Sequence, residues 1–165
     1  MNGALRTISL VCMGFLVVLV IGCTNYQSAA SEVIANVQKD VPFTIIVPAY
    51  FPSDVRPVPS QISGPSTNDI TNSVGVGITY YGKSDNKMII VDEENINIDM
   101  LPAGPYDTFN INEVAVLSQE TSMASATKIY YGLLYSWNRN GVNFQVRIFG
   151  YDQNEGRKII ESMIK

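Results

Sequence analysis

The chain has 165 residues, a length that suits one domain, with 46% hydrophobic and 16% charged residues. Its net charge of −4 and its lack of a basic cluster argue against nucleic-acid binding, which needs a positive face to neutralise phosphates. Histidine is absent, which excludes His-based catalytic triads, His-ligated zinc and imidazole acid–base catalysis.

The two cysteines, Cys12 and Cys23, both lie near the N-terminus. The chain from Thr24 onward therefore has no thiol, no disulfide and no cysteine metal site. We predict no cofactor and no metal for this protein.

An apolar run, Ile8–Ile21, follows the single N-terminal charge Arg6. Its 14 residues fall short of the roughly 20 that span a bilayer as a helix, and they match the hydrophobic region of a secretory signal peptide. An uncleaved membrane anchor is the alternative interpretation.

The end of this run, Val20-Ile21-Gly22-Cys23, resembles the lipobox of bacterial lipoproteins. The resemblance implies cleavage between Gly22 and Cys23, which removes a signal peptide of residues 1–22, and a diacylglycerol on the Cys23 thiol. The membrane would then be a partner, and the protein would lie on its extracytoplasmic face. Thr24 occupies the position where an aspartate commonly marks inner-membrane retention, which favours the outer membrane if the host has one.

Residues 23–41 are expected to form the lipidated cysteine and a tether, with a short helix over Glu32–Asp40. A single β-rich domain should follow over residues 42–165. Phe43–Val47 is a β-branched run between prolines and predicts a buried first strand. Five of the eight prolines fall between Pro48 and Pro65, so the chain to Asn72 is expected to be mostly irregular.

Ser73–Tyr81 alternates apolar and small or polar residues and predicts a strand, and Lys87–Val91 predicts the next one. Four acids come afterwards: Asp92, Glu93, Glu94 and Asp99. They lack the spacing of a calcium loop, so a solvated turn is favoured over a cation site.

The last third of the chain predicts a short strand over Glu113–Leu117, a loop over Ser118–Thr127, and then a hairpin. Asn140-Gly141 is the preferred pair for a type I′ turn between Lys128–Trp137 and Val142–Phe149. A two-residue turn predicts three cross-strand pairs on one face, namely Trp137 with Phe144, Tyr135 with Val146, and Leu133 with Ile148. A four-residue loop keeps the same parity and is the alternative, whereas a three-residue loop would break it.

Asp152–Lys165 predicts a terminal helix, in which Asp152 is the N-cap and Glu155 the N3 residue. Four apolar residues form its stripe: Ile159, Ile160, Met163 and Ile164. We therefore expect an α+β fold, mainly an antiparallel twisted sheet with this amphipathic helix packed on it, after a cleaved signal helix.

The domain resembles an uncharacterised family found in extracytoplasmic regions of bacterial lipoproteins and anti-sigma factors. The matching residues are Phe43–Pro52, Trp137–Phe144 and the helix Glu155–Met163. The resemblance implies this fold and an extracytoplasmic setting, and it carries over no catalytic residue.

The sequence favours a non-enzymatic domain that binds, senses or supports the envelope, with an unidentified protein or envelope partner. Exposed aromatics in Tyr80-Tyr81 and Tyr130-Tyr131 would serve such a partner, although one tyrosine of each pair is expected in the core. Two alternatives stay open: a glycan hydrolase using carboxylates of the acidic stretch, and a carrier whose curved sheet holds an acyl chain.

Overall fold

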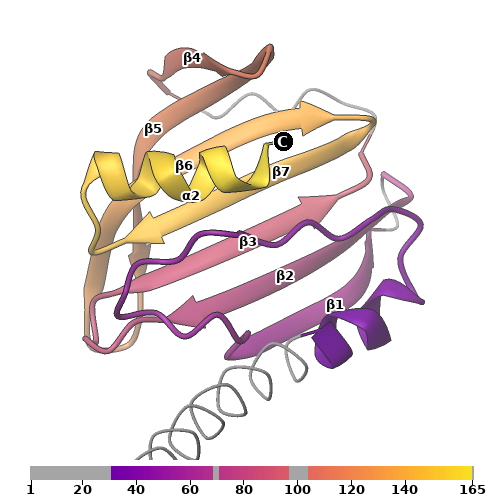
Figure 1. Ribbon diagram of the computed structural model, residues 1–165, viewed down its shortest axis with the longest axis horizontal. Helices are drawn as coiled ribbons and strands as arrows, with labels where there is room; N and C mark the ends of the chain where they lie inside the picture. The colour runs from indigo at the N-terminus through magenta and orange to yellow at the C-terminus, as the bar shows by residue number, and fades with distance from the viewer. Residues whose placement is uncertain (1–30, 69–70, 97–103, 165) are drawn as a thin grey trace, which may run out of the picture.

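The computed structural model describes residues 31–164 except 69–70 and 97–103. They form one seven-stranded antiparallel sheet with the strand order β1-β2-β3-β7-β6-β5-β4 (Figure 1). The strands are β1 (Gln61–Asn68), β2 (Ser73–Tyr81), β3 (Met88–Glu94), β4 (Asp107–Ile111), β5 (Val114–Ala124), β6 (Ile129–Arg139) and β7 (Val142–Phe149). Helix α2 (Gln153–Met163) ends the described chain, and residues 31–38 are also helical. The predicted α+β architecture is confirmed.

The core lies on one face of the sheet, and its centre is formed by β2, β3 and β7. Ile78 pairs with Val91, which pairs with Val146 on the other side, and all three are fully buried. Residues directly opposite one another in a ladder point to the same face, so this row continues across the sheet.

The predicted β6–β7 hairpin is confirmed in its register. Trp137 pairs with Phe144, and their rings stack with centroids 4.9 Å apart. Asn140 and Gly141 have φ of 54° and 75°, and a type I′ turn requires positive φ at both central positions.

Helix α2 covers the β6 and β7 side of the core. Asp152 is its N-cap, and the Asp152 carboxylate accepts a hydrogen bond from the Glu155 backbone N–H at 2.9 Å. The four residues of the predicted stripe are all buried. Gly156 faces Tyr135, because a Cβ at that position would lie only 2.7 Å from the Tyr135 hydroxyl oxygen. The helix can therefore approach the sheet closely at this residue.

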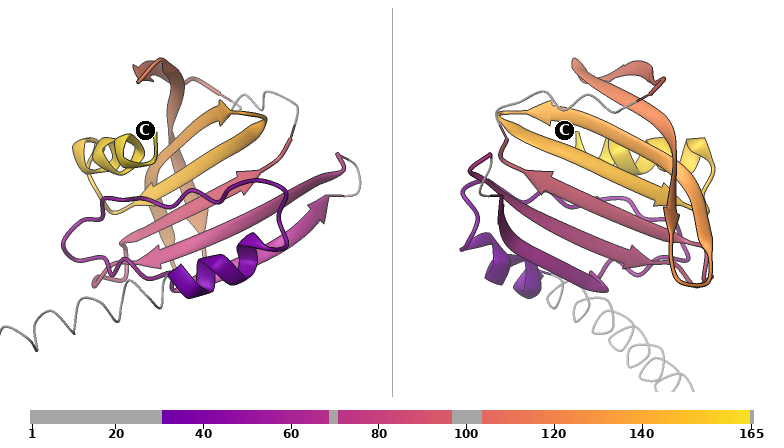
Figure 2. Two further views of the ribbon diagram at one scale, coloured as in Figure 1. Left: turned by 45° about the vertical axis from the view of Figure 1, so that its right-hand side comes forward. Right: turned by 180° about the vertical axis from the view of Figure 1, so that it is seen from behind.

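Residues 41–60 form an extended segment on the same face of the sheet as α2, where they cross β2 and β3 (Figures 1 and 2). Val41, Ile45 and Val55 from this segment are buried in the core. Of the parts of the chain that the structure describes, neither helix nor this segment lies on the opposite face of the sheet (Figure 2).

Several predicted boundaries are wrong. Phe43–Val47 is extended and part of it is buried, but it belongs to no strand. β1 lies within the stretch predicted to be irregular, where the ladder shifts register between Ser63 and Ser66 around Pro65. Proline is tolerated there because β1 is an edge strand.

The β4–β5 region also differs from the prediction. β5 continues through the predicted loop as far as Ala124, because Ser118–Ala124 pairs with β6. β4 is an edge strand that the sequence pattern did not predict.

The expected division between core and surface is confirmed for Tyr80-Tyr81, whereas Tyr130 is only half-buried and does not belong to the core. Tyr80 is buried and Tyr81 is exposed. Tyr131 is exposed, whereas the ring of Tyr130 packs against Phe149 with centroids 6.1 Å apart.

Candidate functional site

The predicted lipidation site, Cys23, and the cleavage position after Gly22 lie outside the described residues. Ser31, eight residues after Cys23, begins the described helical turns. No helix among the described residues has the length and apolar character needed to cross a membrane.

Backbone groups of the extended segment form hydrogen bonds with side chains. In a strand, the same groups would bind the backbone of a neighbouring strand. The Gln38 carboxamide donates to the Phe43 carbonyl at 2.6 Å and accepts from the Ile45 N–H at 2.8 Å. The next N–H, that of Ile46, donates to both carboxylate oxygens of Glu93 at 3.0 and 3.1 Å. These contacts explain why the Phe43–Val47 pattern resembles a strand although the segment joins no ladder.

Glu93 is the one acid among the described residues that the core encloses, with 1% of its surface exposed. Burial raises its pKa to about 8, and the hydrogen bond from Ile46 opposes that shift. Burial also raises the pKa of Tyr80, and the charge of Glu93 adds to this effect. Ile89, Val91 and Glu93 alternate along β3, so they share the face that points into the core. This alternation could have predicted that Glu93 is buried.

The neighbouring acids point to the other face of the sheet. Asp92 pairs with Arg147, and Glu94 accepts a hydrogen bond from Ser73. The predicted solvated turn is wrong for these residues, because all three acids of Asp92-Glu93-Glu94 belong to β3. Asp99 lies outside the described residues. Asp92 and Glu94 line an open hollow of about 320 Å³ between β1, β2 and β3, whereas the Glu93 carboxylate is buried on the core face and bound to Ile46. No cluster of metal-binding side chains occurs in the described part of the chain.

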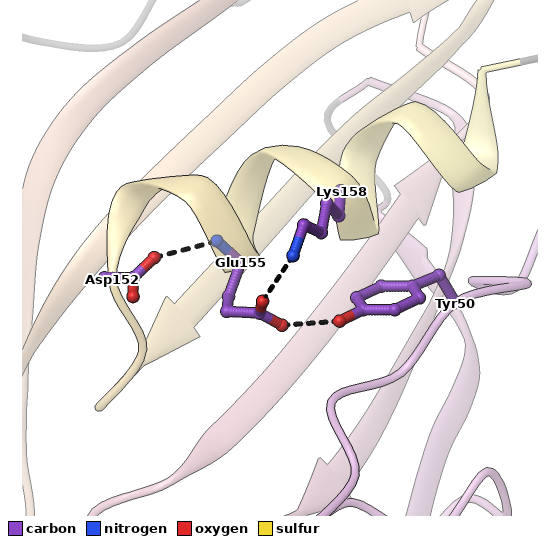
Figure 3. Close-up of polar contacts among 4 residues, drawn as sticks. All are labelled: Tyr50, Asp152, Glu155 and Lys158. Carbon is purple, nitrogen blue, oxygen red and sulfur yellow. Dashed lines mark hydrogen bonds and ion pairs between the residues drawn. The ribbon is translucent and has the colours of Figure 1, made fainter.

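A polar cluster on the surface joins the extended segment to α2 (Figure 3). The Tyr50 hydroxyl donates to Glu155 at 2.6 Å, and the Lys158 ammonium binds the other Glu155 oxygen at 2.7 Å. The bonds from Lys158 and Tyr50 lower the pKa of Glu155, and the bond to Glu155 raises the pKa of Tyr50. Glu155 thus binds Tyr50 and Lys158 through its side chain while its backbone N–H completes the helix cap at Asp152.

A second cluster fixes the far end of the segment. The Asp54 carboxylate binds the Lys87 ammonium at 3.0 Å and accepts a hydrogen bond from the Tyr151 hydroxyl at 3.2 Å. The bond from Lys87 lowers the pKa of Asp54, whereas burial raises the pKa of Tyr151. In both clusters the carboxylate has a lowered pKa and stays charged, so it can keep its partners bound. The two clusters are therefore consistent with holding the extended segment in place on the sheet.

The described surface also carries an apolar groove of about 620 Å³ between the helical residues 31–38 and the proline-rich part of the extended segment. Its lining residues are Ser31, Ile34, Ala35, Gln38, Val47, Pro48, Ala49, Phe51, Pro57, Pro59 and Tyr80. The rings of Phe51 and Tyr80 pack at its floor with centroids 4.8 Å apart. None of these residues is charged, so the groove suits an apolar occupant.

The chain matches no protein-family model, and no curated protein and no solved structure is significantly similar to it. The likeness to the extracytoplasmic domain family therefore stays a prediction from three short motifs.

Proposed function

We propose that this protein is a bacterial lipoprotein, anchored through a diacylglycerol on Cys23 to the extracytoplasmic face of a membrane, with a non-enzymatic binding domain. The observation that carries the anchor is the apolar run ending in Gly22-Cys23, in a chain with no later cysteine. Two acyl chains on one thioether give a stable anchor, because each buried CH₂ contributes about 0.8 kcal/mol and one chain alone binds marginally.

A binding role for the domain is supported by the chemistry of its described surface. The acids of β3 are divided between a buried site and the opposite face, where each has a partner. The apolar groove offers a concave surface that is free of charge. A binding surface needs only such complementarity, whereas hydrolysis needs two acids on either side of a substrate bond.

The anchor is tested by expressing the Cys23→Ala variant with a radiolabelled fatty acid. The native chain should take up label, migrate as the shorter mature form and sediment with membranes. The variant should stay as an unlabelled precursor. Normal processing of the variant would contradict the lipoprotein assignment.

The non-enzymatic assignment is tested by incubating the purified protein with cell-wall glycan. No soluble fragments should be released. Fragments that disappear in a Glu93→Gln or Glu94→Gln variant would establish a hydrolase and overturn this part of the proposal.

A further inference from the structure

The apolar groove lies where the chain enters the domain. Ser31, the first described residue, lines it, and Ser31 comes only eight positions after Cys23. A fully extended chain of that length spans at most about 28 Å. An anchor on Cys23 would therefore keep the groove close to the lipid surface.

The chemistry of the groove favours hydrocarbon over a polar ligand. Its eleven lining residues carry no charge, and the Gln38 carboxamide is already bound to Phe43 and Ile45. Three of them are prolines, which have no backbone N–H to donate. The volume of about 620 Å³ lies within the range of sites that hold small molecules.

Exposed apolar side chains occur on both walls of the groove. Ala35, on the helical wall, is exposed, and Val47, on the segment wall, has 37% of its surface exposed. The exposed charged residues beside the groove are balanced in sign: Glu32, Lys39, Asp40 and Arg56. Apolar contact, rather than attraction to charged headgroups, is what these walls can offer a membrane.

We propose that this face of the domain rests on the membrane that holds its own anchor, and that an acyl chain of a lipid in that leaflet occupies the groove. This inference rests on the proposed lipidation of Cys23. The edge strand β4, at the other end of the strand order, then lies on the side away from the membrane and is open to partners.

The test uses single engineered cysteines in the mature lipidated protein. The proposed modification consumes the Cys23 thiol and cleavage removes Cys12, so a fluorophore reacts only with the engineered residue. The variants are Ala35→Cys and Val47→Cys on the two walls. Tyr106→Cys is the matched control, because Tyr106 is 41% exposed and lies directly before β4.

Each labelled protein is placed in phosphatidylcholine vesicles whose acyl chains carry bromine at mid-chain, and in unbrominated vesicles. Bromine should quench the labels at positions 35 and 47 and leave the label at 106 unchanged. Val47→Asp, added to Ala35→Cys, should reduce quenching at position 35 to the control level while the anchor keeps the protein on the vesicles.

Equal quenching at all three positions would overturn the inference. So would shielding of the label at 47 that rises with protein concentration and not with lipid, since that would identify a second copy as the occupant. Mass measurement of the purified chain separates the two proposals. A chain without lipid refutes the anchor itself, whereas a lipidated chain with equal quenching refutes only the role of the groove.

Discussion

The β6–β7 hairpin and the extended segment 41–60 both bury β-branched and aromatic residues against the same core, yet they are held in different ways. In the hairpin, backbone groups bind one another across a two-residue turn. In the segment, the backbone of Phe43–Ile46 binds the side chains of Gln38 and Glu93. An apolar pattern thus specifies which residues are buried, whereas the identity of the hydrogen-bond partner depends on the rest of the fold.

The two regions also differ in how far their contacts reach along the chain. The turn at Asn140-Gly141 closes the hairpin locally, whereas Ile46 is 47 residues from Glu93 and Ala49 is 113 residues from its partner Ser162. We expect changes in the hairpin to affect the whole domain and changes at the segment to affect mainly its attachment.

The largest effect is expected from Gly132→Ala in the hairpin. A Cβ at Gly132 would overlap the backbone carbonyl oxygen of Ile148 and lie 2.9 Å from Cδ1 of Phe149. Because backbone cannot move aside cheaply within the ladder, the free energy of unfolding should fall by about 3 kcal/mol or more in urea titrations. Gly141→Asn is the control, since nothing lies within 4 Å and asparagine tolerates positive φ. Equal stability of the two variants would contradict this account.

The next largest effect is a dependence of the domain's stability on pH, which we attribute to Glu93. Its pKa is about 8 in the fold against an ordinary value of 4.5, so the folded state binds the proton more tightly. Stability is therefore fully present below about pH 4.5 and is lost as pH rises toward 8, by a few kcal/mol at about 1.4 kcal/mol per pKa unit.

Urea titrations from pH 5 to 8.5 test this slope. Glu93→Gln should flatten it, because glutamine has no proton to lose. Glu94→Gln, on the opposite face of β3, should retain it. A native protein as stable at pH 8.5 as at pH 5 would show that the burial of Glu93 does not control the attachment of the segment.

A smaller effect is expected from Gln38→Ala. The change leaves the Phe43 carbonyl and the Ile45 N–H without their partner. For these partly buried groups the loss should be about 1–2 kcal/mol, because an unpaired group that is fully buried costs about 1–3 kcal/mol. Hydrogen exchange should speed up at Ile45 while the β6–β7 amides stay protected. Asn36→Ala is the control, because the Asn36 side chain lies at the surface and accepts its hydrogen bond from the exposed Lys39. If hydrogen exchange at Ile45 and at the β6–β7 amides sped up equally, the extended segment would not be attached independently of the hairpin.

The smallest effect is expected from Asp54→Asn, which removes the ion pair with Lys87 at a partly exposed site on the surface. The loss should be about 1 kcal/mol or less. Its pH dependence has the opposite sign to that of Glu93, because the pKa of Asp54 is lowered and its contribution disappears as pH falls below about 4. A thermal melt at pH 7 and again at pH 3 should show the difference between native and variant only at pH 7.

The sequence predicted those elements whose determinants are local. Asn140-Gly141 fixed the register of the hairpin, and Asp152 with the stripe from Ile159 to Ile164 located α2. β2 was predicted to the residue because its alternation has no competing signal.

Elements with distant determinants were not predicted. β1 contains Gly64 and Pro65 and becomes a strand only because β2 lies beside it, and the second half of β5 depends on β6. The groove could not be predicted either, since its walls are brought together by contacts between Gln38, Phe43 and Ile45 that no spacing rule describes. The proposed lipidation of Cys23 is the opposite case, because only the local sequence around Cys23 predicts it.

The irregular shape of the edge strand β1 bears on whether neighbouring copies of a membrane-tethered protein can associate through their sheets. Proteins tethered to a membrane share one orientation and reach high local density, so exposed strand edges meet their counterparts far more often than in solution. In β1, Pro65 and the shift in register between Ser63 and Ser66 interrupt the row of backbone groups that a neighbouring copy would extend. In the membrane-anchored state that we propose, the irregular edge would therefore oppose sheet-to-sheet polymerisation between neighbouring copies.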